Sequence, residues 1–170
     1  MTRDEAFMRL ATAEARLAFA VGEVPVGAVA VYREQVIGRG HNLKETQRDP
    51  MAHAELLALR EAARFRGGWR LPGVVLYCTM EPCPMCAGAM LQARIPRLVF
   101  AVDDPKAGAA GSVVDLLQNP SFNHQLQVER GVLAAEVQSL LADFFSGLRD
   151  GTIPRRSERW RRLAKNLDSG

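Results

Sequence analysis

The sequence predicts an α/β fold, because segments rich in strand-forming residues alternate with segments of helical periodicity along its 170 residues. An apolar content of 48% is enough for a packed core. No internal repeat or low-complexity stretch divides residues 1–150, so we expect them to form one domain. Alternation of this kind places helices on both faces of a sheet.

The first elements are predicted from a helix cap and two strand-like runs. Thr2 and Glu5 form a capping-box pattern, and apolar residues then recur at helical spacing as far as Val21. Residues 3–21 are therefore expected to be helical. Two strands and a loop are predicted next, over residues 26–32, 36–41 and 42–47.

A second helix is predicted to begin at Asp49-Pro50 and to reach about Phe65. An N-capping aspartate followed by a first-turn proline is a typical helix start, and it would place His53 in the first turn. The next strand, helix and strand are predicted over residues 74–79, from Cys83 or Pro84 to about Ile95-Pro96, and over residues 97–102.

The last third of the chain is expected to complete the sheet and end in a long helix. A loop, a short helix, a fifth strand and a final helix are predicted over residues 103–112, 113–117, 125–130 and 133–149. Residues 151–170 hold six basic and two acidic residues and form a basic tail, although the whole chain has a net charge of only +3. Such a tail can contact phosphates, with Trp160 stacking on a base, or it can be a solvated or capping helix.

Composition also limits where the protein is expected to act. The N-terminus is charged, and no apolar run approaches the length needed to cross a bilayer. Three cysteines, two of them spaced C-x-x-C, do not indicate a disulfide framework. We therefore expect a soluble cytoplasmic protein that does not associate with membranes.

Two short segments carry the chemistry that the sequence suggests. His53-Ala54-Glu55 is followed, twenty-eight residues after Glu55, by Cys83-Pro84-Met85-Cys86. One imidazole and two thiolates can fill three of the four positions around zinc and leave the fourth for water, which is the arrangement of a catalytic zinc site. Both segments lie at predicted helix starts after strands, where α/β sheets commonly build their sites.

Glu55 is the nearest candidate for a general base. Thiolate ligands donate charge to zinc, so bound water is acidified less and a base is useful. His53 and Glu55 are two residues apart, about 200° around a helix, which fits one ligand and one non-ligand. C-x-x-C alone could be a structural zinc knuckle or a redox pair. Outside the site, Cys78 is expected in the core, and His41 and His124 lack ligand-spaced partners.

H-A-E together with P-C-x-x-C is the signature of the zinc-dependent nucleobase deaminases. Over nearly its whole length the sequence resembles the bacterial tRNA-specific adenosine deaminases. The segments that carry the resemblance are residues 23–29, 49–55, 81–90 and 104–112. Cytidine deaminases generally have C-A-E where this chain has His53. Guanine deaminases share much of the E-P-C-P-M-C run, which therefore cannot decide the substrate alone.

The resemblance implies a three-layer α/β/α, cytidine-deaminase-like fold with a five-stranded mixed sheet. It implies one Zn²⁺ per chain, held by His53, Cys83 and Cys86, with Glu55 as the proton shuttle. The expected reaction is hydrolytic conversion of adenosine to inosine at the wobble position of an anticodon, in an arginine tRNA. The expected partners are a tRNA anticodon stem-loop and a second copy in a homodimer, with no organic cofactor.

The resemblance also assigns substrate-binding positions. Asn42 matches a contact to the target nucleoside, and Val26 and Ala54 match the base pocket. The expected contacts to the rest of the anticodon loop are Asp104, Lys106, Phe145 and Arg149. Ordinary packing is the alternative for Val26, Ala54 and Phe145, a turn residue for Asp104, and a solvated charge for Lys106.

Two other functions fit part of the pattern. A small-molecule deaminase would turn over free guanine or cytosine and would not need RNA. A zinc-stabilised RNA-binding module would have no activity, but it would also have no use for the carboxylate of Glu55.

Overall fold

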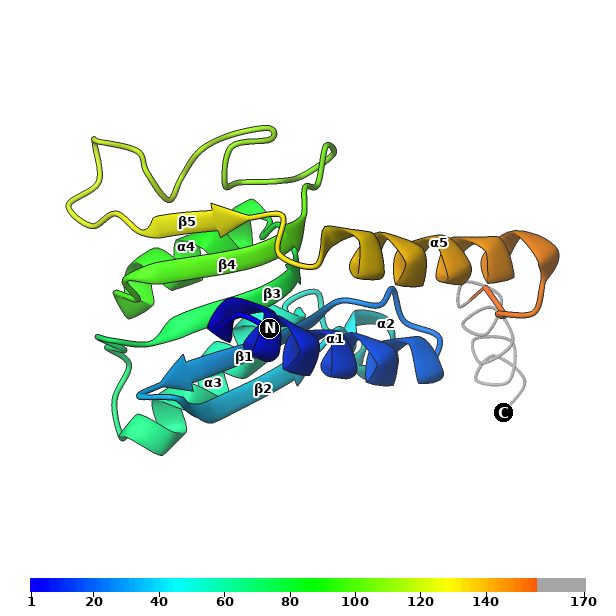
Figure 1. Cartoon of the computed structure of the whole chain (residues 1–170), viewed down its shortest axis with the longest axis horizontal. Coiled ribbons are helices and arrows are strands. Elements are labelled where there is room, and N and C mark those ends of the chain that lie inside the picture. The colour runs from blue at the N-terminus through cyan, green and yellow to red at the C-terminus, as the bar shows by residue number, and fades with distance from the viewer. Residues whose placement is uncertain (156–170) are drawn as a thin grey trace, which may run out of the picture.

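A five-stranded mixed sheet forms the centre of the protein in a computed structural model that describes residues 1–155 (Figure 1). The strands are β1 (Gly27–Tyr32), β2 (Gln35–His41), β3 (Val75–Met80), β4 (Arg97–Val102) and β5 (Gln127–Arg130). Their order is β2-β1-β3-β4-β5. β1 runs antiparallel to both of its neighbours, whereas β3, β4 and β5 are parallel.

Helices cover both faces of the sheet, as predicted. The helices are α1 (Arg3–Ala20), α2 (Lys44–Gln47), α3 (Ala54–Arg66), α4 (Pro84–Ala93) and α5 (Ala134–Asp150). α1 and the start of α5 share one apolar cluster, and α3 and α4 share the other. This confirms the three-layer α/β/α arrangement. α5 continues past the ends of the strands, alongside the end of α1 (Figure 1).

The alternation of side chains along each strand separates the two layers of core. In β1, Ala28 and Ala30 face the α3 and α4 cluster, while Val29 and Val31 face the α1 cluster. A Cβ added at Gly40 of β2 would overlap the backbone carbonyl oxygen of Ala54. The close packing that this glycine allows brings the first turn of α3 against the sheet.

Local signals in the sequence placed several boundaries correctly. The Thr2 hydroxyl accepts a hydrogen bond from the Glu5 amide, and the Glu5 carboxylate accepts one from the Thr2 amide, so the predicted capping box is confirmed. Arg33 and Glu34 both have positive φ, 48° and 65°, which is the backbone of a two-residue type I′ hairpin between β1 and β2.

The predicted start of the second helix was wrong. Asp49 caps a tight turn, because its carboxylate accepts the Met51 amide at 2.8 Å and its carbonyl accepts the Ala52 amide at 3.1 Å. The helix begins at Ala54, and His53 is its N-cap residue, with extended backbone (φ −82°, ψ 148°). Residues 49–53 therefore form a tight turn and an extended N-cap where the first turn of a longer helix was expected.

Two shorter assignments also differ. Residues 42–47, predicted as loop, contain the one-turn helix α2. Residues 113–117, predicted as a short helix, form turns and an isolated bridge between Ala110 and Asp115. The amides of Val113 and Val114 both donate to the carbonyl of Gly108, so they bond to a tight loop rather than to a helix.

The described part of the chain ends at Arg155, so residues 156–170, with Trp160, lie outside it. The predicted role of most of the basic tail therefore stays a prediction, as does the division into a domain of residues 1–150 and a tail. Among residues 1–155, no helix is both long enough and apolar enough to cross a membrane.

Candidate metal centre and active site

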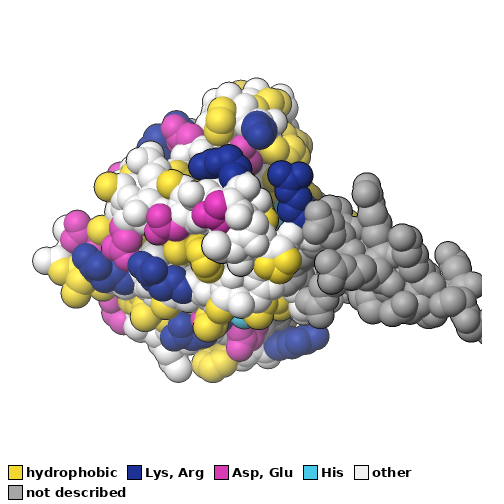
Figure 2. Space-filling model, turned by 90° about the vertical axis from the view of Figure 1, so that its right-hand side faces the viewer, with side chains coloured by type: hydrophobic (Ala, Val, Ile, Leu, Met, Phe, Trp, Pro, Cys, Tyr) yellow, Lys and Arg dark blue, Asp and Glu magenta, His cyan; other side chains and the backbone are white. Residues whose placement is uncertain are grey.

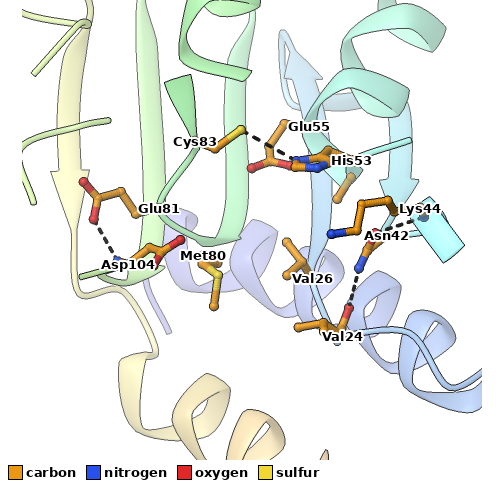
Figure 3. A pocket seen from close by; sticks show the side chains of 11 residues that line it. Val24, Val26, Asn42, Lys44, His53, Glu55, Met80, Glu81, Cys83 and Asp104 are labelled. Atoms are coloured by element: carbon orange, nitrogen blue, oxygen red, sulfur yellow. Dashed lines mark hydrogen bonds between the residues drawn. The ribbon is translucent and has the colours of Figure 1, made fainter. Parts of the chain in front are cut away.

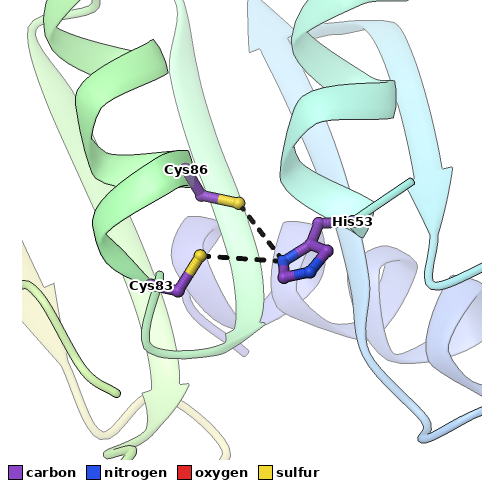
Figure 4. Close-up of side chains that lie close together, drawn as sticks. All are labelled: His53, Cys83 and Cys86. Atoms are coloured by element: carbon purple, nitrogen blue, oxygen red, sulfur yellow. Dashed lines mark hydrogen bonds between the residues drawn. The ribbon is translucent and has the colours of Figure 1, made fainter. Parts of the chain in front are cut away.

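The three predicted metal ligands meet between the starts of α3 and α4 (Figure 4). His53 is the N-cap of α3 and Cys83 is the N-cap of α4, with Pro84 as the first helical residue. Cys86, one turn into α4, is fully buried. The two helix starts lie on the same face of the sheet, so the imidazole approaches the thiols from across the gap between them.

The distances within this group fit a shared cation. His53 Nδ1 lies 3.7 Å from Cys83 Sγ and 3.6 Å from Cys86 Sγ. Ligands of tetrahedral zinc at ordinary Zn–N and Zn–S distances would put nitrogen and sulfur about 3.6 Å apart. Among the described residues, this is the group of three ligand-type side chains whose donor atoms lie within 4.8 Å of one another. The arrangement can hold a metal ion and leaves room for a fourth ligand.

The surrounding groups favour a thiolate in this cluster. Hydrogen bonding from the Cys86 thiol, with a further contribution from His53, lowers the pKa of Cys83 to about 4. The same interaction with Cys83 raises the pKa of Cys86. The hydrogen bond to Cys83 also raises the pKa of His53. One sulfur is therefore a ready anionic ligand, and a cation would be needed to stabilise the second.

Glu55 lies beside the metal group and is almost completely buried, with 4% of its surface exposed. Its carboxylate points toward the space between His53 and Cys83 (Figure 3). Burial is the main reason why the pKa of Glu55 is raised, and the neighbouring His53 opposes that shift. A carboxyl with a raised pKa next to a metal site has the properties of a general acid and base.

A pocket of about 170 Å³ opens directly onto these residues (Figure 3). It is lined by Val24, Val26, Asn42, Lys44, His53, Ala54, Glu55, Met80, Glu81, Cys83 and Asp104. The structure therefore brings five of the predicted catalytic and substrate-binding residues into one cavity, together with two of the three metal ligands. The predicted residues are Glu55, Asn42, Val26, Ala54 and Asp104.

Asn42 is held at the rim by its own side chain. Its Nδ2 donates to the carbonyl of Val24 at 3.2 Å, and its Oδ1 accepts the amide of Lys44 at 3.1 Å. Glu23, buried to 2% exposure, accepts the amide and hydroxyl of Thr46 at 2.7 and 2.9 Å. These bonds order the segment after β2 at the pocket mouth.

The other three predicted RNA contacts lie outside this pocket. Lys106 is exposed, on the loop after β4. Phe145 and Arg149 line a wider groove along α5, which shares Val24, Asn42 and Lys44 with the first pocket. Phe145 is 42% exposed, whereas its neighbour Phe144 is 2% exposed and packs on Phe19. Both phenylalanines border the groove, but Phe144 is mostly buried in the core and Phe145 is the one exposed to solvent.

Sequence reasoning missed four residues of the pocket. These are Val24, Lys44, Met80 and Glu81. Val24 and Glu81 were noticed only as parts of matching segments. Nothing local indicates that Lys44 or Met80 faces the site. His41 and His124 lie outside the site, as expected: His41 pairs with Glu14 at 3.1 Å, and His124 bonds the carbonyl of Ile95 at 2.8 Å. Cys78 is fully buried, as expected of a core thiol, but it lies beside Glu55, and burial together with that neighbour raises the pKa of Cys78.

Comparison with known proteins agrees with this geometry. A family model described as MafB19-like deaminase matches residues 2–149. The chain is 49% identical to the tRNA-specific adenosine deaminase of Bacillus subtilis over 149 residues, covering 88% of this chain and 92% of that protein. It is 48% identical to the protein of the same name from Haemophilus influenzae over 148 residues, covering 86% of each.

Solved structures show the same architecture. One, from a study of A-to-I editing by deaminases acting at the wobble position of tRNA, has a TM-score of 0.76 at 43% identity and covers 79% of this chain and 98% of that one. The guanine deaminase of Nitrosomonas europaea, at 24% identity and a TM-score of 0.69, covers 85% of each chain and shows the fold alone.

The fold, with a His-Cys-Cys group beside a buried glutamate, defines a hydrolytic deaminase with the cytidine-deaminase-like architecture. Within that class, the chain belongs to the family of tRNA-specific adenosine deaminases.

Proposed function

We propose that this protein converts adenosine to inosine at the wobble position of a tRNA anticodon, with an arginine tRNA as its substrate. One observation carries the proposal: a buried glutamate and a metal-ligand group share one pocket, in a chain nearly half identical to tRNA-specific adenosine deaminases. The buried carboxylate of Glu55 beside the metal ligands also favours an enzyme, because a module that only binds RNA would have no use for it.

The ion that fits the site best is Zn²⁺. Two thiolates and one imidazole are ligands typical of zinc, and three protein ligands leave the fourth position open, as in catalytic zinc sites. His53, Cys83 and Cys86 would hold one ion per chain. When bound, zinc supplies the acidity that makes a water molecule nucleophilic near neutral pH.

Glu55 would move the protons of the reaction. Water adds to the ring carbon that bears the amino group, and the carboxylate takes one proton from it and gives that proton to the adjacent ring nitrogen. A second proton passes through Glu55 to the amino group, which leaves as ammonia, and inosine remains. The raised pKa that burial gives Glu55 suits a group that must accept and release protons in turn.

The remaining pocket residues would hold the nucleoside and its flanks. Asn42, which bonds the carbonyl of Val24, would also bond the target nucleoside, and Val26 and Ala54 would lie against the base. Asp104 at the rim and Lys106 on the same loop would meet the anticodon-loop backbone. Phe145 and Arg149 would contact neighbouring nucleotides in the α5 groove. RNA is read in this way where bases are splayed out of a loop.

We also propose that the protein works as a homodimer in the cytoplasm, where its tRNA substrate would be found. Met51 lies two residues before His53 and is 52% exposed, and Met85 lies between Cys83 and Cys86 and is 36% exposed. Val113 and Val114 are 54% and 43% exposed. A second subunit would cover these exposed apolar side chains. Light scattering after size-exclusion chromatography would give the mass directly.

A panel of substrates tests the proposed function. Ammonia release would be measured with an anticodon stem-loop that carries a wobble adenosine, and with free adenosine, guanine and cytosine. The proposal predicts turnover of the stem-loop, with the free compounds at background. Turnover of guanine or cytosine with no reaction of the stem-loop would replace it with the small-molecule alternative.

A further inference from the structure

Glu81 is a buried acidic residue of the pocket that the proposed reaction does not use. It follows the last residue of β3, Met80, and only 2% of its surface is exposed. Its own amide donates to the carbonyl of Val102 at 2.9 Å, which joins the ends of β3 and β4. This bond holds the backbone of Glu81 in place. Its carboxylate points toward the loop after β4, next to Asp104 (Figure 3).

The carboxylate accepts four hydrogen bonds, all from that loop. Oε2 accepts the amide of Asp104 at 2.8 Å and also the hydroxyl of Ser112. Oε1 accepts the amides of Ala110 and Ser112, each at 3.0 Å. Two carboxylate oxygens have about four lone-pair directions, so these bonds satisfy the group completely. The donors lie 23 to 31 residues farther along the chain.

The loop is shaped around this group. A Cβ added at Gly108 would overlap the Glu81 carboxylate, so a side chain at this position would push the two apart. The Ala109 amide donates to the carbonyl of Pro82 at 2.8 Å, which ties the loop to the segment that leads into Cys83. Apart from an isolated bridge, residues 103–112 have no regular secondary structure. The Glu81 carboxylate accepts backbone amides of this loop that would otherwise bond to a neighbouring strand.

We propose that Glu81 is a positioning residue, whose carboxylate holds the loop of residues 103–112 in the shape that presents Asp104 and Lys106 to the anticodon-loop backbone. The inference rests on the proposed function and extends it, because Glu81 would act on substrate binding through the loop without touching the reacting atoms. The Asp104 carboxylate accepts the Lys106 amide at 3.0 Å, so displacement of Asp104 would move Lys106 as well.

The decisive variant is Glu81→Gln. It keeps the shape of the side chain but points an NH₂ group at backbone amides that are themselves donors. Losing hydrogen bonds to a charged acceptor is worth about a tenfold change or more in an equilibrium. We expect the KM for an anticodon stem-loop to rise about tenfold, with kcat within about twofold of the unaltered protein. Bound zinc should stay at one per chain.

Two further variants separate positioning from general damage. Ser112→Ala removes one of the four donors and should raise KM by a smaller factor, and its effect should be less than additive with Glu81→Gln because both act on one set of bonds. Glu14→Gln alters another buried carboxylate, 8% exposed. Glu14 lies on α1 and pairs with Arg39 and His41, which both lie on β2. This control should leave the KM unchanged.

Hydrogen exchange of the Asp104, Ala110 and Ser112 amides gives a second readout that needs no substrate. Faster exchange in Glu81→Gln, and not in Glu14→Gln, is expected. If the unaltered protein formed no inosine, the proposed function would fail, while exchange would still decide whether Glu81 holds the loop. Unchanged KM and exchange in a folded Glu81→Gln protein would overturn the inference, and so would a loss confined to kcat. If Glu81→Gln does not fold, Ser112→Ala decides by the same two readouts.

Discussion

Individual residues of the site owe their roles to where the backbone places them. His53 and Cys83 are both N-cap residues with extended backbone, so their side chains leave the helix ends instead of lying along a helix face. Glu55, in the first turn of α3, points into the same space from a helical position. The metal ligand His53 and the proton carrier Glu55 therefore come from the same three residues, and each side chain has its own role in the site.

Glu55→Gln is the first prediction at this scale. The amide is close in shape to the carboxyl but cannot carry a proton back and forth, so we expect kcat to fall by about 10²- to 10⁴-fold. Zinc content and unfolding temperature should stay near those of the unaltered protein. A rate within a few-fold of the original would remove Glu55 from the mechanism.

The second prediction compares two cysteines of different function. Cys83→Ser should lose most of the bound zinc, because a hydroxyl is a poor substitute for a thiolate ligand. Cys78→Val is the matched control, since Cys78 is fully buried and its thiol donates to the carbonyl of Met80. Metal analysis of both purified proteins distinguishes them, and equal zinc content would contradict the ligand assignment.

Secondary-structure elements are held in register by a few polar contacts as well as by the core. Asp4, at the start of α1, accepts two hydrogen bonds from Arg97 of β4, at 2.9 and 2.7 Å. It also accepts the hydroxyl of Tyr77 of β3 at 2.8 Å. Burial, together with this hydrogen bond, raises the pKa of Tyr77 to about 12. One carboxylate thus fastens α1 to two parallel strands.

This contact predicts an acid-dependent loss of stability. The hydrogen bond from Arg97 is the main reason why the pKa of Asp4 lies below its ordinary value of 3.8. The contribution of Asp4 to stability is therefore present above that ordinary value and is lost as the pH falls through the lowered pKa of the folded state. Asp4→Asn should lower the free energy of unfolding by about 1 kcal/mol near neutral pH.

Urea unfolding over a pH series checks this prediction. The difference between Asp4→Asn and the unaltered protein should shrink as the pH is lowered below about 4. Asp143→Asn, which changes an exposed carboxylate on α5, should follow the unaltered protein at every pH. If Asp4→Asn lowered the free energy of unfolding by the same amount at every pH, the ion pair between Asp4 and Arg97 would not be the cause of that loss.

The elements that could be predicted from sequence are those specified by nearby residues. The capping box of α1 and the strand over residues 97–102 are both indicated by patterns of adjacent residues, and both were predicted correctly. Asp49-Pro50 gave a false helix start because the same residues also cap a turn. The helix predicted over residues 113–117 was wrong because the amides of Val113 and Val114 bond the carbonyl of Gly108. Gly108 lies in a loop whose shape depends on Glu81, which is far away in sequence and accepts the amides of Ala110 and Ser112.

The same distinction applies to the site. The metal group could be predicted from spacing, because each cluster is short and lies at a helix start. Lys44 and Met80 could not, because only the assembled sheet brings the segment after β2 close to the end of β3. No property of either residue, taken alone, indicates that it lines a pocket.

The whole molecule gathers its reactive groups at one end of the sheet. The pocket lies where β3 and β4 end, and the groove along α5 continues from it. On the face in Figure 2, basic side chains are interspersed with acidic and hydrophobic ones, without a field of one sign. Residues 1–155 carry no net charge, because 17 basic residues are balanced by 17 acidic ones, so the five basic residues within residues 156–170 are relevant to RNA binding.

Removing residues 156–170 is the prediction at this scale. We expect weaker tRNA binding and a shallower dependence of affinity on salt, because each lost phosphate contact lowers the slope by about 0.7 to 0.9. Titrations of tRNA at several salt concentrations, with full-length and shortened chains, measure both quantities. If the dependence of affinity on salt were unchanged, the tail would not contact phosphates, and the alternative of a solvated helix would hold.

The central claim is deamination of one defined adenosine in RNA, and position-resolved detection of inosine tests it most directly. The full-length protein would be incubated with an unmodified arginine tRNA that has a wobble adenosine, and with a matched transcript in which the adenosine is moved to the next anticodon position. We predict inosine at the wobble position of the first tRNA and none in the second. Inosine in both transcripts, or in neither while the protein is folded and holds zinc, would contradict the account.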